Sequence, residues 1–162
     1  MEDNFLFLDT ETTGFGECRM IELAYGRLNG PIQVVRAKPP IPIGKEATII
    51  HGICDKDLAD VPAFVAHPEY HLIKATIENS IVVAHNAIFD VEVLAREGIR
   101  VEHYIDTRRL AKKIYREFSH HNLQHLRQQL ELETEGNAHS AGGDVAVLIA
   151  LFKRMLVESV VL

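Results

Sequence analysis

The sequence predicts an α/β domain in which a central mixed β-sheet is flanked by α-helices. Three strand-like segments come first, and strand-like and helix-like segments then follow in mixture, which is the order typical of a mixed sheet covered by helices. The length of 162 residues suits one domain with a substantial core, so we predict a single domain spanning residues 1–162. A hydrophobic content of 47% and a charged content of 25% are ordinary for a globular protein.

The strands are predicted where short apolar or alternating segments are bounded by turn residues. They lie at residues 5–9, 19–28, 32–38 and 81–86, with a short edge strand near 99–102. The helices are predicted from apolar residues that recur every three or four positions. They lie at residues 67–79, 88–97, 106–117, 122–130 and 141–160. After the third strand we expect an extended connection at 39–44 and short helical turns within 46–60.

Composition argues against several classes of protein. No run of about 18 apolar residues occurs, so we expect no membrane span. The first ten residues lack the basic segment of a signal peptide, and Cys18 and Cys54 form no metal-binding or redox motif. These features predict a cytoplasmic protein with free thiols. The net charge of −6 argues against binding of nucleic acid by bulk charge alone, but it permits binding of phosphates through metal ions.

The first strand leads into two carboxylates, Asp9 and Glu11, within the segment FLFLDTETTG. In a strand, residues two apart point to the same side. Two negative charges are therefore expected side by side at the end of an apolar element. Folding does not require this arrangement, so a compensating group is expected nearby.

Two further acids are predicted to face inward on helices. Asp90 precedes Val93 and Leu94 by three and four positions, which places it on the apolar face of its helix. Asp144 precedes Leu148 by four positions, near the start of the last helix. An unpaired buried charge is costly, so each acid needs a partner. The alternative for Asp90 is a capping role at the helix start.

A loop before the last helix carries His139, five residues ahead of Asp144. Ser140 is a candidate N-cap for that helix. Gly142 and Gly143 would permit a close approach of the backbone to another group. A lone histidine in a loop is usually a surface residue, so a functional role for His139 is predicted only in combination with the acids near it.

One arrangement accounts for the four acids and the histidine, namely a site for divalent cations. Oxygen ligands of this kind suit Mg²⁺ or Mn²⁺ rather than zinc. Two ions about 3.5–4 Å apart would contact the attacking and leaving oxygens of a phosphodiester. The sequence therefore predicts two Mg²⁺ or Mn²⁺ ions held by Asp9, Glu11, Asp90 and Asp144.

The chain resembles the DEDDh branch of the DnaQ-like 3′–5′ exonucleases, whose fold is RNase H-like. The segments that carry the resemblance are FLDTETTG at 7–14, IIHGI at 49–53, HNAIFD at 85–90 and HSAGGD at 139–144. The histidine five residues before Asp144 separates this branch from the one that has a tyrosine in the last motif. The short length and the segment 107–126 are most similar to the exodeoxyribonuclease X group.

The resemblance implies metal-dependent hydrolysis of phosphodiester bonds from the 3′ end, with nucleoside 5′-monophosphates as products. It implies that His139 is the general base, a role that an ordinary histidine pKa of about 6.5 suits. Asp9 would bridge the two metals, Glu11 and Asp144 would hold the metal that carries the attacking water, and Asp90 would support the other metal. It also implies a set of substrate-binding residues: Thr12, Thr13, Gly14, His51, Asn86 and Phe89. His85 is expected to be structural.

The sequence leaves the substrate and the partner open. DNA is favoured over RNA, as a single strand or another 3′-ended form. The alternatives are a proofreading-type subunit that acts with a DNA polymerase, a 3′–5′ exoribonuclease or oligoribonuclease, and a non-catalytic nucleic-acid-binding module on the same fold. Because only 18 residues follow Asp144, we expect no separate docking tail for a polymerase or repair partner, although the core itself could bind one.

Two other patterns have a functional and a structural interpretation. Arg108, Lys112 and Arg116 are spaced by four, with Arg109 and Lys113 beside them. This basic stripe would guide a nucleic-acid backbone, or it is an ordinary solvated helix face. The spacing of His121 and His125 would suit a zinc pair on a helix, but no further soft ligand is near, so surface histidines are expected.

Overall fold

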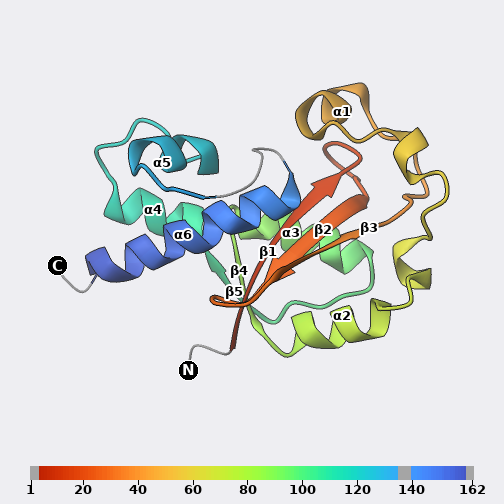
Figure 1. Ribbon diagram of the computed structural model, residues 1–162, viewed down its shortest axis with the longest axis horizontal. Coiled ribbons are helices and arrows are strands. Elements are labelled where there is room, and N and C mark those ends of the chain that lie inside the picture. The colour runs from red at the N-terminus through yellow and green to blue at the C-terminus, as the bar shows by residue number, and fades with distance from the viewer. Residues whose placement is uncertain (1–3, 135–139, 160–162) are drawn as a thin grey trace.

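A five-stranded mixed sheet forms the centre of the protein in this computed structural model, which describes residues 4–134 and 140–159 (Figure 1). The strand order is β3-β2-β1-β4-β5. The strands are β1 (Phe5–Thr12), β2 (Met20–Gly26), β3 (Ile32–Arg36), β4 (Ile81–Ala84) and β5 (His103–Asp106). β2 runs antiparallel to β1 and β3, whereas β4 is parallel to β1 and β5 is parallel to β4. The predicted mixed sheet is confirmed.

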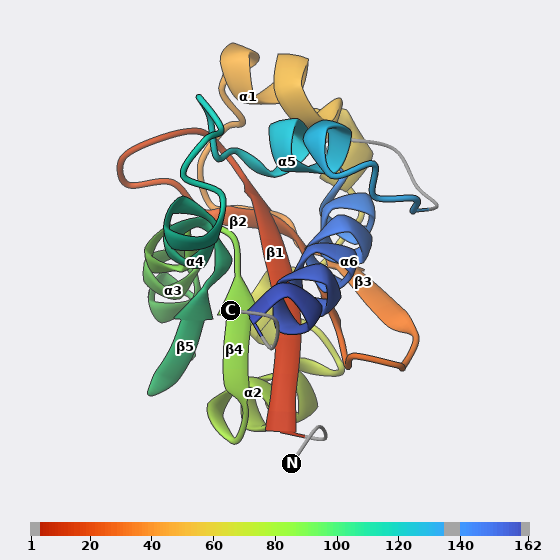
Figure 2. The same ribbon diagram turned by 90° about the vertical axis from the view of Figure 1, so that its left-hand side faces the viewer.

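Helices cover both faces of this sheet. They are α1 (Lys45–His51), α2 (Tyr70–Glu78), α3 (Ala87–Arg96), α4 (Thr107–Ile114), α5 (Leu123–Gln129) and α6 (Ala141–Ser159), with 3-10 turns η2 (Asp55–Leu58) and η3 (Phe64–Ala66). Figure 2 shows α3 and α6 on opposite sides of the sheet. One core lies between the sheet and helices α2 and α3, and another lies between the sheet and α6. Helices α4 and α5 pack against α6 in a third cluster.

The alternation of side chains along β1 decides what each face of the strand contacts. Leu6 and Leu8 belong to the core that includes α3, whereas Phe7 belongs to the core under α6. By the same alternation, Asp9 and Glu11 share the side of Phe7. β1 stays in register with β2 through both acids, so the strand is three residues longer than predicted.

The C-terminal ends of the parallel strands meet at one edge of the sheet. Ala84 at the end of β4 is paired with Asp106 at the end of β5. Helices α3 and α4 therefore begin beside each other, close to the end of β1. Ligands of open α/β sheets bind at this kind of edge, outside the carboxyl ends of the strands.

Several predicted boundaries were wrong by a few residues, as for the end of β1. The edge strand was expected near 99–102, but β5 begins at His103 because the residues directly after α3 form the turn that ends this helix. Gly98 adopts φ +79°, and the buried Ile99 donates its backbone N–H to Leu94 of α3. Helix α4 was expected to reach residue 117, but it ends at Ile114.

The state of the two cysteines and the apolarity of the helices bear on two further predictions. Cys18 and Cys54 are both free thiols, as predicted. Among residues 4–134 and 140–159, no helix has the length and apolarity that crossing a membrane requires.

Replacement of Phe152 by alanine should lower the free energy of unfolding by about 3–5 kcal/mol. The ring is only 4% exposed and contacts Phe5 and Phe7 of β1 edge-to-face, with centroid distances of 5.6 and 5.3 Å. Urea denaturation measures the loss. Leu156→Ala, on the same helix but 46% exposed, is the matched control and should cost much less. Equal losses for the two variants would contradict the packing described here.

Candidate active site

Three of the four predicted acids converge at the end of β1. Asp9 and Glu11 lie on the strand, and Asp144 lies in the first turn of α6. Each of the three side chains is half-buried. One carboxylate oxygen from each lies within 4.8 Å of the other two. The packing of α6 on β1 therefore brings together acids that are more than 130 residues apart in the chain.

The fourth acid, Asp90, reaches β1 from the opposite side of the sheet. It is 3% exposed, as its predicted inward position requires. Its Oδ1 accepts hydrogen bonds from the backbone N–H of Thr10 (3.1 Å) and from the Thr10 hydroxyl (2.8 Å). Thr10 stands between Asp9 and Glu11, so Asp90 is tied to the strand that carries the other acids. It does not cap α3, and it is not one of the three acids with closely spaced oxygens.

Burial and mutual repulsion raise the pKa values of these acids. The pKa of Asp9 is raised well above its ordinary value by burial and by the neighbouring charges, of which that of Asp90 has the largest effect. Burial and the Asp144 charge raise the pKa of Glu11 to about 8. Burial raises the pKa of Asp90 to about 7, although the two hydrogen bonds from Thr10 oppose this rise. Within the described residues, no Lys or Arg forms an ion pair with Asp9 or Glu11.

This donor set fits a divalent cation. Closely spaced carboxylate oxygens with no protein cation against Asp9 or Glu11 are hard ligands of the type that Mg²⁺ and Mn²⁺ prefer. An acidic metal-binding group is therefore present at this edge of the sheet. The identity and the number of ions are matters for the proposal below.

A fifth acid, Glu22, supports the group and was missed in the sequence. It is 4% exposed on β2, directly opposite Glu11. One carboxylate oxygen accepts the backbone N–H of Ala141, the first residue of α6, at 3.3 Å, and the other accepts from Arg36 of β3 at 2.8 Å. Glu22 thus ties the start of the helix that carries Asp144 to the sheet. The pattern that could have revealed it is a charged residue inside the otherwise apolar segment MIELAYG.

Gln124 of α5 also holds Asp144, and no pattern in the sequence indicated it. Its side-chain amide donates to Asp144 Oδ1 at 2.6 Å. The start of α6 is fixed locally as well, because the Ser140 hydroxyl accepts the backbone N–H of Gly143 at 3.2 Å. This confirms Ser140 as the N-cap.

A cavity of about 180 Å³ opens beside Glu11. It is lined by Thr10, Glu11, Thr12, Gly14, Phe15, Ala47, Ile50, His51 and Phe89. His51 Nδ1 accepts the backbone N–H of Ile53 (3.1 Å), so its other ring nitrogen donates to the Thr12 carbonyl (3.2 Å). Burial lowers the pKa of His51, so the ring is neutral at physiological pH. At the rim, Phe15 is 85% exposed and Ile50 is 48% exposed.

The predicted substrate-binding residues occupy two kinds of position. Thr12, Gly14, His51 and Phe89 line the cavity. Thr13 is buried and closes the following loop, since its backbone N–H and its hydroxyl oxygen both bond to the backbone of Arg19. Asn86 starts α3 in the left-handed conformation (φ 73°), and its N–H donates to Asp106 at 3.1 Å. Contact of these six residues with substrate stays a prediction.

His139, the predicted general base, lies outside the described residues. The other histidines of interest have protein partners. His85 contacts the Thr107 hydroxyl (2.9 Å) and the backbone carbonyl of His121 (2.8 Å), as a structural residue would. His121 precedes α5 and bonds to the Tyr115 carbonyl, while the His125 ring packs on Phe118 and His120. Because His121 lies before α5, the two histidines do not share that helix, and the part of the chain that is described places neither in a metal-binding group.

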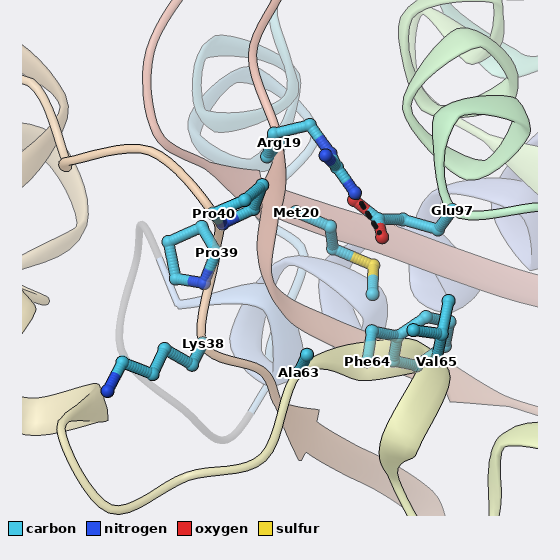
Figure 3. Close-up of a pocket in the computed structure, with 9 residues that line it drawn as sticks. All are labelled: Arg19, Met20, Lys38, Pro39, Pro40, Ala63, Phe64, Val65 and Glu97. Atoms are coloured by element: carbon cyan, nitrogen blue, oxygen red, sulfur yellow. Dashed lines mark hydrogen bonds and ion pairs between the residues drawn. The ribbon is translucent and has the colours of Figure 1, made fainter.

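A second cavity, of about 300 Å³, has different chemistry (Figure 3). Its charged residues Arg19 and Glu97 face each other and form a two-bond ion pair, with N–O distances of 2.8 and 3.0 Å. Lys38 points away from this pair and donates to the Ala59 carbonyl. None of the clustered acids at the end of β1 lines this cavity.

Comparison with known proteins agrees with this geometry. The sequence profile of the RNase T exonuclease family matches residues 6–152, which is nearly the whole chain. The chain belongs to the RNase T exonuclease family. The resemblance to DnaQ-like 3′–5′ exonucleases inferred from the motifs is thereby confirmed.

Relatives of this exonuclease-family chain are mostly longer proteins. It is 29% identical to a DNA polymerase III subunit epsilon-like protein of Rhodobacter capsulatus, over 94% of this chain and 23% of that protein. It is 31% identical to the DNA polymerase III subunit epsilon of Buchnera aphidicola subsp. Schizaphis graminum, over 68% of this chain and 56% of that subunit. The chain therefore spans less than two thirds of the length of these curated relatives.

Solved structures confirm the RNase H-like exonuclease fold. Exonuclease X in complex with 5′ overhanging duplex DNA matches with a TM-score of 0.79 and 24% identity, over 96% of this chain and 92% of that one. Exonuclease I of E. coli in complex with a dT13 oligonucleotide matches with a TM-score of 0.75 and 20% identity, over 97% of this chain and 41% of that one.

Divalent metal should stabilise the protein most at alkaline pH. The pKa values of Glu11 and Asp90 in the folded protein lie above their unfolded values of about 4, so the folded state binds protons more tightly. Without metal, their ionisation lowers stability progressively from about pH 4 to about pH 8. A cation that binds only the folded, ionised site reverses this loss. At metal concentrations about 100 times Kd the gain is about 2.7 kcal/mol, or roughly 5–10 °C in Tm.

Thermal melts between about pH 5 and pH 8, with Mg²⁺, Mn²⁺ or chelator, measure this gain. The difference between metal and chelator should grow with pH, and Glu11→Gln should reduce it. Asp60→Asn, which removes an exposed acid elsewhere, is the matched control and should leave the difference unchanged. Identical midpoints with metal and with chelator at every pH would contradict the site.

Replacement of Glu22 by alanine should destabilise the protein by about 1–3 kcal/mol, because the buried N–H of Ala141 loses its acceptor. The same variant should weaken metal binding, because the start of α6 positions Asp144. Glu22→Gln keeps an acceptor oxygen and should retain most of both properties. Calorimetric titration with Mn²⁺ and urea denaturation compare the variants. Metal affinity in Glu22→Ala equal to that of the wild type would refute the positioning role.

Proposed function

We propose that this protein is a divalent-metal-dependent 3′–5′ exonuclease that acts on DNA in preference to RNA and releases nucleoside 5′-monophosphates. The observation that carries the proposal is the convergence of Asp9, Glu11 and Asp144 beside a cavity at the end of β1. Membership of the exonuclease family supports the same reaction.

Asp9, Glu11 and Asp144 would hold two Mg²⁺ or Mn²⁺ ions, with Asp90 supporting one of them from the α3 side. Bound metal would supply Lewis-acid polarisation of the phosphodiester and a water of lowered pKa. The chain keeps the carboxylates in place through Thr10, Glu22 and Gln124. His139 would take the proton of the attacking water, as the resemblance implies.

The cavity beside Glu11 would hold the 3′-terminal nucleotide. The exposed ring of Phe15 and the side chain of Ile50 present apolar surface at its rim, and Phe89 lines it from α3. Aromatic and apolar side chains stack on nucleobases without regard to sequence, which suits an enzyme that removes nucleotides one after another. His51 would shape the cavity rather than carry charge, because its two ring nitrogens are bonded to the backbone.

The preference for DNA is supported by the neighbours, since the solved structures of Exonuclease X and Exonuclease I hold DNA. A second candidate function is proofreading together with a DNA polymerase. The relatives named as polymerase III epsilon subunits favour it, because they share this exonuclease region. A non-catalytic binding module is disfavoured, since such a module would not need three acids that repel one another.

Digestion of matched oligonucleotides tests the proposal. Single-stranded DNA and RNA of one sequence, each labelled at the 5′ end, are incubated with Mg²⁺, Mn²⁺ or chelator and resolved on a gel. We expect stepwise shortening from the 3′ end, only with metal and faster for DNA. Asp9→Asn should abolish the reaction while leaving Tm near that of the metal-free wild type, whereas Asp60→Asn should be fully active.

Each alternative has its own outcome in this experiment. Faster shortening of RNA would favour an exoribonuclease. Activity only after addition of a polymerase would favour the proofreading subunit. Absence of shortening under all conditions, with metal shown to bind, would favour the binding module. Full activity of Asp9→Asn would overturn the assignment of the carboxylates.

A further inference from the structure

Helix α4 and the residues after it concentrate positive charge on an acidic protein. Residues 107–116 contain Arg108, Arg109, Lys112, Lys113 and Arg116 and no Asp or Glu. The whole chain has a net charge of −6, so the rest of the chain is more acidic still. A local excess of cations on such a chain attracts a polyanion to one place rather than to the whole surface.

Four of these cations form one exposed row, which we call the α4 stripe: Arg109, Lys112, Lys113 and Arg116. Spacings of three and four residues place Arg109, Lys112 and Lys113 on one side of the helix, and Arg116 follows in the turn after Ile114. The other side of α4 packs through Ala111 into the cluster that contains Leu151 of α6. The row differs from the sequence prediction in one member, because Arg108 is half-buried and lies beside the stripe.

The cations of the α4 stripe have no carboxylate partner within the described part of the chain. Some other exposed cations do have one, for example Arg154, which pairs with Glu158 on α6 at 2.7 Å, whereas the exposed Lys56 has none among the described residues. Arg108 shows a related feature, since its Nε is buried and has no hydrogen-bond partner among the described residues. A row of exposed cations that have no carboxylate partner among the described residues is a surface suited to phosphate.

The α4 stripe starts at the same sheet edge as the carboxylates. Asp106, the N-cap of α4, accepts the backbone N–H of Asn86, which begins the helix that carries Asp90. On the other flank of the site, Ala47 of α1 lines the cavity and packs on Ile21 of β2. Phe89 of α3 lines the cavity on the side of β4, so a strand that left the cavity past α3 would meet the start of α4.

We infer that the α4 stripe binds the phosphate backbone of the cleaved strand on the 5′ side of the scissile bond. This inference rests on the proposed exonuclease function for the position of the 3′ end. An eight-residue helix is about 12 Å long, which suits contacts with two or three successive phosphates. The stripe accordingly favours long strands over short ones without changing the chemical step at the carboxylates.

The test compares a variant that lacks the four charges of the stripe, Arg109→Gln/Lys112→Gln/Lys113→Gln/Arg116→Gln, with a matched control, Lys38→Gln/Lys56→Gln/Arg100→Gln/Lys153→Gln. The control removes four exposed cations from other elements and leaves the same net charge. Fluorescence anisotropy with 5′-labelled single-stranded DNA of about 20 nucleotides, in chelator, gives Kd between about 20 and 200 mM NaCl. The stripe variant should reduce the slope of log K against log salt by about 1.4–2.1, the value for two or three phosphates of a single strand, and the control should not.

Kinetics then separate this inference from the proposed function. With metal, the stripe variant should lose at least about tenfold in kcat/KM on the long strand, while its kcat on a tetranucleotide stays within about twofold of the wild type. An unchanged salt slope, an unchanged preference for length, or failure of the wild type to bind the long strand would overturn the role of the stripe. A defect seen only when a complementary strand is annealed would assign the stripe to that strand instead. Failure of the wild type to cleave any strand would overturn the exonuclease proposal. The salt dependence of the binding constant would still show whether the α4 stripe contacts the phosphates of the strand.

Discussion

The mutual repulsion of Asp9, Glu11 and Asp144 is the constraint around which this edge of the protein is built. Their carboxylate oxygens lie within 4.8 Å of one another, and burial together with the charges of Asp144, Glu22 and Asp90 raises the pKa of Glu11 to about 8. Apolar residues at these positions would pack without that cost, so stability alone does not explain the arrangement. Three polar contacts hold it together: Thr10 with Asp90, Glu22 with the start of α6, and Gln124 with Asp144.

The two faces of β1 contribute different residues to the site. The side that continues from Phe7 presents Asp9 and Glu11 to α6, whereas the side that continues from Leu8 presents Thr10 to Asp90 of α3. Because both helices are anchored in hydrophobic cores, the acids are carried on rigid elements. Charges of opposite sign lie at this sheet edge, with acids at the end of β1 and, on α4, cations that have no carboxylate partner among the described residues. Under the two proposals above, an acidic protein would bind a polyanion through metal at one place and through Lys and Arg at another.

Much of the fold followed from local patterns. Apolar strands, helical periodicity and turn residues predicted the mixed sheet and most of its helices. The errors fell where tertiary contacts decide an end. β1 runs on through Asp9 and Glu11 because β2 pairs with it there, and β5 starts late because Ile99 is buried at the end of α3. Glu22 could have been predicted, because it is a charge within an apolar strand. Gln124 could not, because its contact with Asp144 depends on how α5 packs on α6.

By itself, the sequence determined the fold class, the two acids on one side of a strand, the inward position of Asp90 and the resemblance to DnaQ-like exonucleases. Each of these depends on spacing within one element or on a contiguous motif. The sequence predicted that Asp144 joins Asp9 and Glu11, but only the tertiary structure showed how close their oxygens lie and that Asp90 is bonded to Thr10 from the other face. The tertiary structure also decided that the exposed cations of α4 lack carboxylate partners among the described residues. Distances between side chains on different elements depend on how those elements pack, and a linear pattern does not contain that information.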